Sequence, residues 1–355
     1  MLFAQDVARL SVTRGTTGLP VGLHNINTES QPLVPSLVVE GAQNLDEAHI
    51  WLVLCPRHWR KYMGPKKDSS IIADFVLLMV AFVWGFTFIM VKQAIAEVGV
   101  YPFLFLRFTL SLVFMILIFA KKLLRLDRFI VFSGTVLGVF LFLAYAFQTT
   151  GLAYTSASNA GFITGLNVIF VPIFSIVIFK QIPRPLTVLG IVVATGGLFL
   201  LTGGYGDGFN RGDILILACA ICYAMHILCT GRYAPTMDVY LLATVQIGVV
   251  ALFSLPFAIF SLSSIPSGIS LSVWKSVIFT GLLATVFAFV AQTRAQRFTP
   301  PPRAALILLM ESVFCAITAR FYGGERLSGV ALAGGILMVI GMVLAELRRI
   351  RAQKM

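Results

Sequence analysis

The sequence predicts an all-α membrane protein whose ten transmembrane helices form two inverted five-helix repeats. Composition is the first of three observations behind this prediction. Of the 355 residues, 58% are apolar and 12% are charged, where roughly 25% charged is usual in soluble domains. A soluble globule has too little interior to hide so much apolar surface. The apolar stretches are continuous and do not alternate with polar residues, which favours helices over an outer-membrane barrel.

The spacing of the apolar runs after residue 70 is the second observation. Each run has roughly the 20 residues that a bilayer core requires. The expected helices cover residues 71–92, 102–120, 128–148, 158–180, 185–202, 212–232, 239–260, 271–292, 302–322 and 328–347. Prolines, a basic cluster and a glycine-rich loop separate them. In chain order these breaks are Pro102, residues 121–128, Pro183 and Pro185, residues 203–208, Pro235, Pro266 and residues 300–302.

An internal repeat is the third observation. A shift of 144 residues places Gln148 on Gln292, Thr155 on Thr299, Asn167 on Glu311, Gly190 on Gly334 and Gly197 on Gly341. A shift of 139 residues places Asp74 on Asp213, Trp84 on Tyr223 and Arg107 on Gln246. Because each copy has an odd number of helices, the second copy must be inverted relative to the first. Inverted repeats are a recurring design of transporters, with the binding site at the repeat interface near the bilayer midplane.

The predicted domains are the two repeats, at residues 71–202 and 212–347, and two tails. Residues 1–70 contain no run long enough to span a bilayer, and residues 348–355 form a basic cytoplasmic tail. The segment MGPKKDSS at 63–70 resembles an ordinary start of a membrane protein. Two interpretations of the upstream residues stay open, a start-site extension or a poorly ordered cytoplasmic tail.

Lysine and arginine set the expected orientation. With the N-terminus inside, 19 basic residues fall on the inner side and 5 on the outer side, as the positive-inside rule requires. The outer five are Lys92, Arg211, Lys275, Arg320 and Arg326. We therefore expect an inner (plasma) membrane protein with both termini cytoplasmic. The net charge of +12 follows from this topology, so no nucleic-acid partner is expected.

The cysteines indicate neither a disulfide framework nor a metal site. Their number is odd, and four of the five lie in apolar runs. Cys219, Cys222 and His226 share one face of a predicted helix, but metal sites usually take four ligands. No nucleotide-binding or cofactor motif occurs in the chain. A membrane-embedded enzyme would need a nucleophile with a nearby base, and no carboxylate accompanies His226 at helical spacing.

Two polar residues lie at the same predicted depth in the two repeats. Glu311 is near the middle of the ninth helix, and Asn167 is at the equivalent place in the fourth. A charge at membrane depth is costly and suggests function by default. A protonatable carboxyl at this depth can couple substrate movement to protons, which makes Glu311 the candidate for coupling. The alternative is a neutral, hydrogen-bonded packing residue.

The other candidates for a substrate pathway are Trp84, Arg107, Tyr145, Tyr223, His226 and Gln246. Aromatic rings at mid-membrane depth can line a pathway or pack helices together. Arg107 is expected to attract a carboxylate, to pair with Glu311, or to snorkel to the interface. His226 is a candidate proton relay or a packing residue. Gln148 and Gln292 close their helices and are expected to be interfacial caps or site residues.

Four stretches of the sequence carry a family resemblance: VWGFTFIMVK (83–92), FLRFTLSL (105–112), residues 151–181 and residues 308–347. In these stretches the chain resembles the drug/metabolite transporter superfamily, with two copies of its EamA-type domain. That family typically ends the fourth helix of each copy with Gly-Glu, which the second copy has as Gly324–Glu325 and the first replaces by Lys180–Gln181. It often has Glu-Pro in the ninth helix, where this chain has Glu311–Ser312.

The resemblance implies a ten-helix inner-membrane carrier that exports amino acids or related metabolites. Secondary transport by alternating access is the leading prediction, because no nucleotide motif supplies another energy source. An uncoupled uniporter or exchanger is the alternative, and a sensor with a transporter-like fold is a third class, because fold alone does not settle function. The expected partners are a small-molecule substrate and the lipid bilayer, without a metal or a cofactor.

Overall fold

The structure, a computed structural model, describes residues 67–178, 180, 182–201, 210–261, 268–322 and 328–352. All of the helices belong to one compact unit, Pro56–Met355. Its first half contains α2 (Lys67–Val98), α3 (Val100–Leu123), α4 (Arg128–Leu152), α5 (Ala157–Gly165), α6 (Asn167–Val177) and α7 (Pro185–Leu201). Its second half contains α8 (Arg211–Tyr233), α9 (Val239–Phe260), α10 (Leu271–Gly281), η4 (Leu282–Phe287), α11 (Ala288–Ala295), α12 (Pro301–Leu308), α13 (Met310–Tyr322) and α14 (Gly329–Ala352).

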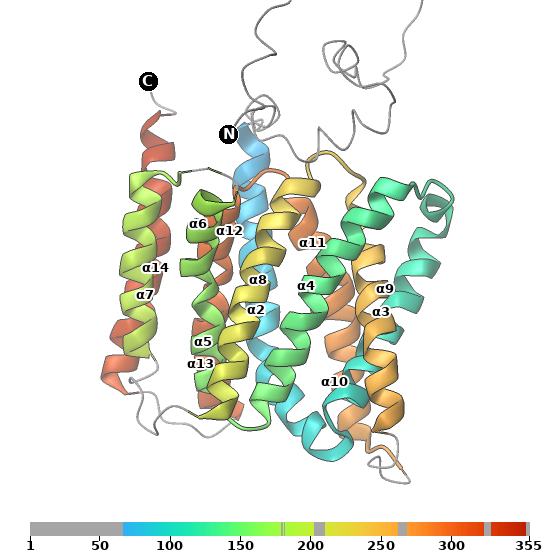
Figure 1. The fold of residues 1–355 in the computed structure, drawn as a ribbon. Coiled ribbons are helices and arrows are strands. Elements are labelled where there is room, and N and C mark those ends of the chain that lie inside the picture. Colours follow the sequence, from blue (N-terminus) through green and yellow to red (C-terminus); the bar gives the residue numbers. More distant parts are fainter. Residues whose placement is uncertain are drawn as a thin grey trace, which may run out of the picture. The chain divides into compact units, whose positions relative to one another are not determined.

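Helices make up most of the described residues, and successive membrane-crossing units run antiparallel to one another in a bundle (Figure 1). Eight segments are long and apolar enough to cross a membrane, and two shorter apolar helices cover residues 185–201 and 329–344. These ten units correspond to the ten expected from the sequence. The first helix begins at Lys67, ahead of the expected residue 71, and α14 continues to Ala352.

Polar side chains fix several helix starts. Asp127 accepts hydrogen bonds from the backbone N–H groups of Phe129 and Ile130 at the start of α4. Asn210 and Asp213 form a capping box at the start of α8. Each cap satisfies backbone donors that have no partner within the helix. The turns therefore lie where short polar residues interrupt the apolar runs.

Three of the ten units are not the uninterrupted helices that the apolar runs predict. The fourth unit breaks at Leu166 between α5 and α6, and the ninth breaks at Leu309 between α12 and α13. Shorter i→i+3 bonds mark both places, from the Leu166 N–H to the Ile163 oxygen (3.1 Å) and from the Ser312 N–H to the Leu309 oxygen (3.0 Å). The eighth unit widens into the π-helical segment η4. Apolar run length carries no information on such local changes of pitch.

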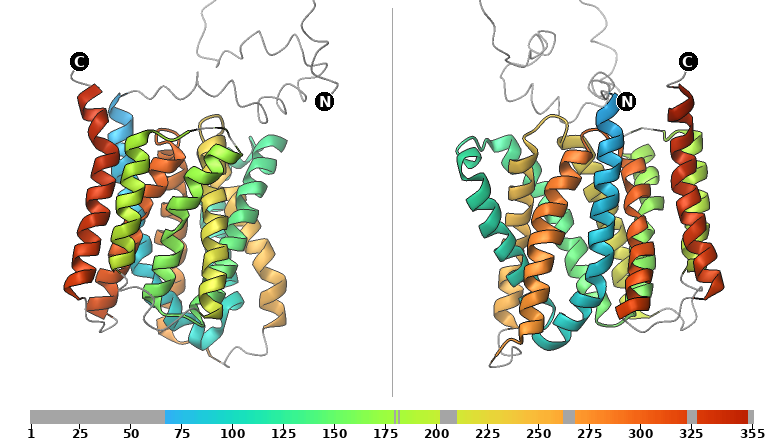
Figure 2. Two further views of the ribbon diagram at one scale, coloured as in Figure 1. Left: turned by 60° about the vertical axis from the view of Figure 1, so that its left-hand side comes forward. Right: turned by 180° about the vertical axis from the view of Figure 1, so that it is seen from behind.

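The helices α7 and α14 pack side by side at one edge of the bundle (Figures 1 and 2). Their contact is built on small residues: a Cβ added to Gly197 would lie 2.6 Å from the Gly334 oxygen, and one added to Gly341 would lie 2.5 Å from the Gly190 oxygen. Small residues let helix backbones approach closely where apolar burial gives no driving force. The repeated glycines are therefore the contact surface between these helices.

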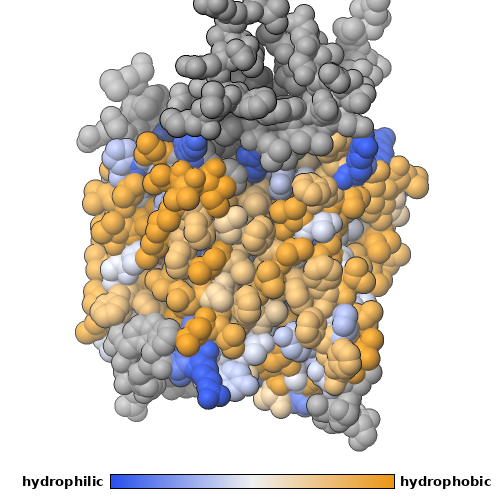
Figure 3. Space-filling model, in the orientation of Figure 1, coloured by the Kyte–Doolittle hydropathy of each residue, from blue (hydrophilic) through white to orange (hydrophobic). Residues whose placement is uncertain are grey.

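The outer surface carries a broad hydrophobic band with hydrophilic groups at its two ends (Figure 3). Large apolar side chains such as Leu117, Phe199 and Phe260 are exposed on it. An exposed band of this kind is what a helix bundle presents to lipid. The interior, in contrast, contains a set of buried polar residues, among them Arg107, Asp213, His226 and Gln246.

Candidate functional site

A cavity lies inside the bundle, between helices of both halves. Its volume is about 40 Å³, which is room for about three water molecules. Seven of the eight candidate residues line it: Trp84, Arg107, Tyr145, Asn167, Tyr223, His226 and Glu311. The eighth, Gln246, does not line the cavity. The structure thus brings together side chains from α2, α3, α4, α6, α8 and α13.

Arg107 of α3 is buried, with 2% of its surface exposed. Its Nε donates to Thr285 Oγ1 at 2.9 Å, and its Nη2 donates to the Tyr145 hydroxyl at 3.2 Å and to the Ala284 oxygen at 3.4 Å. Its Cζ also lies 4.8 Å from the centroid of the Tyr145 ring. The expectation that Arg107 snorkels to the interface is wrong, because the guanidinium faces these interior groups and is closed off from the surface.

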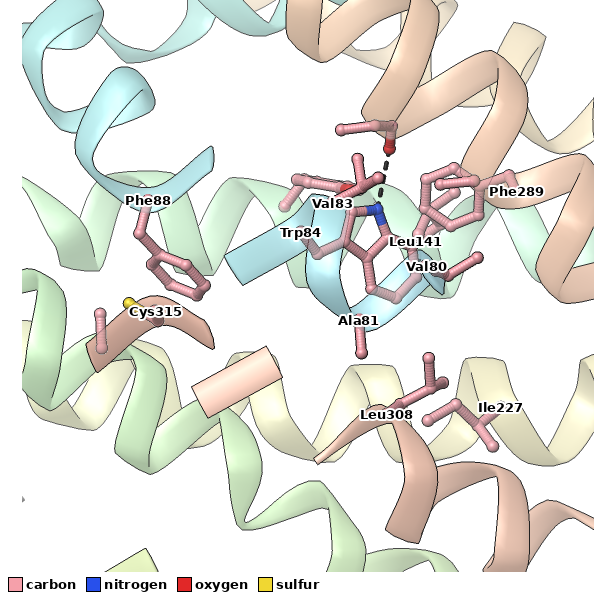
Figure 4. Packing of buried hydrophobic residues seen from close by; sticks show 14 of the residues in the cluster. Val80, Ala81, Val83, Trp84, Phe88, Leu141, Ile227, Phe289, Leu308 and Cys315 are labelled. Atoms are coloured by element: carbon pink, nitrogen blue, oxygen red, sulfur yellow. Dashed lines mark hydrogen bonds between the residues drawn. The ribbon is translucent and has the colours of Figure 1, made fainter. Parts of the chain in front are cut away.

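The π-helical segment η4 supplies the acceptors for Trp84 and Arg107. Trp84 Nε1 donates to the Ala284 oxygen at 2.9 Å, and its ring lies 5.3 Å from the ring of Phe289 (Figure 4). Thr285 Oγ1 donates to the Thr280 oxygen, five residues earlier, at 2.8 Å. A π turn releases carbonyls from the α-helical pattern and is often found at functional sites. The segment η4 therefore bonds to both α2 and α3 through the Ala284 oxygen.

Tyr145 and Tyr223 form the aromatic wall between the two halves. Their ring centroids are 5.8 Å apart in an edge-to-face arrangement, which is a favourable geometry for aromatic pairs. The Tyr223 hydroxyl donates to Gln148 Oε1 at 3.3 Å, and Gln148 Nε2 donates to Thr164 Oγ1 at 3.2 Å. Gln148 is thus part of a polar chain along the cavity, and so not an interfacial cap.

His226 connects the cavity to Gln246 behind it. His226 Nε2 and Gln246 Oε1 are 2.8 Å apart, and Gln246 Nε2 donates to Thr293 Oγ1 at 3.5 Å. Both side chains are buried. Gln246 therefore orients the imidazole of His226. Gln246 itself is not part of the cavity lining.

Glu311 and Asn167 stand at the break points of their helices. Glu311 is the second residue of α13 and Asn167 is the first residue of α6. Within the described parts of the chain, the Glu311 carboxylate has neither a hydrogen bond nor an ion pair, and Asn167 Oδ1 is buried without a hydrogen-bond donor. The expected pairing of Arg107 with Glu311 is therefore not observed, although both line the cavity. The break beside Glu311 occurs although Ser312 stands where the family often has proline.

Hydrogen bonds between the halves join the helices at both ends of the bundle. Thr155 Oγ1 donates to Asp213 Oδ1 at 2.8 Å. At the other end, Thr299 Oγ1 donates to Asp74 Oδ1 at 2.9 Å, and Arg303 forms an ion pair with Asp74. Thr155 and Thr299 correspond in the internal repeat, as do Asp74 and Asp213. The two contacts are therefore equivalent under the internal repeat: in each, a threonine of one half bonds to an aspartate of the other half.

Phe289 and Thr164 line the cavity but were not identified from the sequence. Gln292, which the sequence left as an interfacial cap or a site residue, also lines the cavity, and its Oε1 is buried without a donor among the described residues. The repeat pairing of Gln148 with Gln292 was the one available signal. No group of three His, Cys, Asp or Glu residues in the described segments is arranged to hold a metal ion. The pair Gly324–Glu325 lies outside the described residues.

Comparison with known proteins gives this architecture its context. The sequence matches the EamA-like transporter family twice, over residues 71–203 and 210–347. This chain belongs to the EamA-like transporter family. The two matches correspond to the two halves inferred from the internal repeat, so the chain is a multi-pass membrane protein with two EamA-like domains.

Individual relatives support the same assignment. An uncharacterized transporter of Archaeoglobus fulgidus is 33% identical over 285 residues, which cover 80% of this chain and 89% of that protein. The uncharacterized transporter YetK of Bacillus subtilis is 27% identical over 218 residues, 58% of this chain and 66% of YetK. A crystal structure with a TM-score of 0.62 and 19% identity covers 78% of this chain and 96% of its own. That likeness concerns the fold alone.

Proposed function

We propose that this EamA-family member is a secondary transporter of the inner (plasma) membrane that exports amino acids or related small metabolites, coupled to protons through Glu311. The observation that carries the proposal is the Glu311 carboxyl at the cavity wall, without a polar partner in the described structure. A carboxyl at such a depth is costly and is retained where a function uses it. Exchange of a proton for substrate at this carboxyl would couple the two movements.

Alternating access is the proposed mechanism, with the two halves rocking around the cavity. The proposed inversion of the repeats is supported by the contacts Thr155–Asp213 and Thr299–Asp74, which occupy corresponding positions at opposite ends. In inverted-repeat carriers, one half moves against the other around a fixed central site. Opening one end of the bundle would break the contact at that end and leave the contact at the opposite end intact.

Orientation and direction complete the proposal. The excess of lysine and arginine at the end where α2 begins supports a cytoplasmic location for both termini. Export of amino acids or related metabolites is the direction and substrate class that the family resemblance implies. The lining of the cavity, a few polar groups among aromatic side chains, is of the kind that binds a small polar substrate.

The test is efflux from cells that express the full chain, loaded with a panel of amino acids and related metabolites. Wild type is compared with Glu311→Gln at several external pH values. Export of one class, lost or made pH-insensitive by the substitution, is the expected result, because glutamine cannot release a proton. Glu97→Gln is the matched control, since Glu97 lies at the end of α2 and bonds Ser270.

The other outcomes separate the alternatives. Equal export with equal pH dependence in wild type and Glu311→Gln would contradict proton coupling at Glu311 and favour an uncoupled uniporter or exchanger. No flux of any compound, with normal membrane expression of the wild type, would contradict the proposed export of this substrate class.

A further inference from the structure

Arg107 is the cavity residue to which the proposed proton coupling assigns no role. Its three hydrogen-bond acceptors are a threonine hydroxyl, a tyrosine hydroxyl and a backbone carbonyl, and none of them carries a charge. These three hydrogen bonds use the Nε donor and the two Nη2 donors. A guanidinium offers five donors, so Arg107 is only partly satisfied.

A buried cation without an anion is costly, and other described cations show how the chain usually avoids it. Lys122 pairs with Asp238 at 2.7 Å, and Arg303 pairs with Asp74. Arg107 is more deeply buried than Lys122, and its contacts among the described residues are the neutral acceptors and the rings of Tyr145 and Phe108, at 4.8 and 5.2 Å from its Cζ. Aromatic faces attract a cation more weakly than a carboxylate does.

Glu311 does not provide the missing negative charge for Arg107. It lines the same cavity as Arg107, yet no ion pair joins the two side chains in the described structure. A binding space that holds a guanidinium and a carboxyl apart can accept a ligand that brings its own negative charge to the arginine.

We infer that Arg107 binds a carboxylate of the transported substrate, so that the substrates are small carboxylic acids or zwitterions. The two remaining donors, both on Nη1, can bond to the oxygens of a carboxylate, and the positive charge of the guanidinium strengthens those hydrogen bonds. Nε and Nη2 are held in place by Thr285, Tyr145 and Ala284, which fixes the plane of the group before the ligand arrives. This inference rests on the proposed transport function and specifies the chemistry of its substrate.

The two possible roles of Arg107 predict different effects of Arg107→Met on the Tm of the protein without ligand. If Arg107 only joins α3 to η4 and α4, the substitution removes those hydrogen bonds and lowers the Tm. If Arg107 is a binding site for the anion of a ligand, the substitution removes a buried charge that has no counter-charge in the empty protein. Apolar replacement of a buried charge is often neutral or stabilising, and Ala284 and Thr285 keep their bonds to Trp84 and Thr280.

The experiment measures Tm of the purified full chain with neutral L-amino acids and with their methyl esters, which differ only in the carboxylate. We expect at least one acid to raise the Tm of the wild type and its ester to leave Tm unchanged. For Arg107→Met we expect an empty-protein Tm at or above wild type and binding of that acid weakened at least about 30-fold. Arg107→Lys keeps the charge and should retain part of the response.

Three results of the Tm experiment would overturn the inference. The esters could stabilise the wild type as well as the acids do, Arg107→Met could respond to the acid as strongly as the wild type, or the wild type could respond to no acid. Efflux of compounds that lack a carboxylate would uphold the proposed transport and overturn this inference. A carboxylate-dependent Tm shift without efflux would uphold the carboxylate site and contradict the transport function.

Discussion

Single polar residues inside the bundle are held largely by neutral acceptors. Trp84 and Arg107 both bond the Ala284 oxygen, and His226 bonds Gln246. Charged pairs lie nearer the ends of the helices, as with Lys122 and Asp238. Neutral hydrogen bonds can be exchanged for bonds to a substrate at small cost, because the net contribution of each is about 1 kcal/mol. A cavity lined in this way can bind and release.

Asp238 provides a residue-scale prediction on pH. Partial burial raises the pKa of its carboxyl, but the hydrogen bond from Lys122 and those from the backbone N–H groups of Tyr240 and Leu241 outweigh this and lower the pKa below the usual 3.8. The ionised carboxyl therefore stabilises the folded state at pH values above the usual pKa. This stabilisation is lost as the pH falls through the lowered pKa.

The measurement is Tm of wild type and Asp238→Asn between pH 7 and pH 3. Asparagine can still cap α9, so the substitution removes the charge and keeps the cap. We expect Asp238→Asn to melt below wild type at pH 7, with the difference shrinking towards pH 3. The control is Asp127→Asn, which caps α4 and has no ion pair among the described residues. A Tm difference that is constant with pH would contradict the assignment.

At the scale of helices, close contacts between small residues hold the bundle where lipid offers no apolar driving force. Gly85 packs against α13, Gly138 against α9 and Gly197 against α14. These positions tolerate no side chain because the facing atoms include backbone. In α7, Gly197 faces backbone atoms of α14 but the adjacent Gly196 faces open space, so the two positions can be compared directly.

Gly197→Ala and Gly196→Ala are that comparison. A Cβ at Gly197 would meet the Gly334 oxygen at 2.6 Å and the Met338 nitrogen at 2.7 Å, whereas a Cβ at Gly196 meets nothing within 4 Å. Both substitutions gain the same helix propensity. We expect Gly197→Ala to destabilise by about 1–3 kcal/mol through overpacking and Gly196→Ala to leave Tm unchanged or higher. Equal Tm values for the two variants would contradict the packing assignment.

At the scale of the whole molecule, related contacts join the two halves at opposite ends of the bundle. Lys92 adds to the Thr155–Asp213 end by donating to the Thr155 oxygen at 2.8 Å. Arg303 adds an ion pair to the Thr299–Asp74 end. Under the proposed alternating access, these two ends are the extracellular and cytoplasmic gates.

Thr155→Val and Thr299→Val test the gates. Valine keeps the shape of threonine and removes the hydroxyl. With Thr87→Cys as a cavity reporter and the native cysteines replaced, labelling by a membrane-impermeant maleimide is measured from each side of the membrane. We expect Thr155→Val to speed labelling from the extracellular side about fivefold, as the loss of one hydrogen bond permits. Thr299→Val should favour the cytoplasmic side, with a smaller change because Asp74 keeps its ion pair with Arg303.

Contrary results are readily recognised in this design. Equal acceleration from both sides by either variant would mean that the hydroxyl stabilises the fold as a whole and does not close one gate. The double variant is the internal control: it should label faster from both sides, with a balance between the two sides nearer to that of wild type than in Thr155→Val alone.

The sequence alone determined the membrane character, the places of the ten helical units and the pairing of the two halves. These depend on properties that are local along the chain: the length of an apolar run, the prolines and caps between runs, and the residues that recur at a fixed shift. For the same reason it placed Glu311, Asn167 and Trp84 at the depth where the cavity lies, since depth follows from the distance to the helix ends.

Only the tertiary structure decided what those residues meet. The burial of Arg107, its separation from Glu311 and the position of Gln246 behind His226 depend on how the helices are rotated against one another. At the π turn in η4, the Ala284 carbonyl accepts hydrogen bonds from Trp84 and Arg107, which lie on two other helices. Such contacts join residues far apart in the chain, as with Trp84 and Ala284. Helix periodicity records which residues share a face, and packing alone decides which face meets which partner.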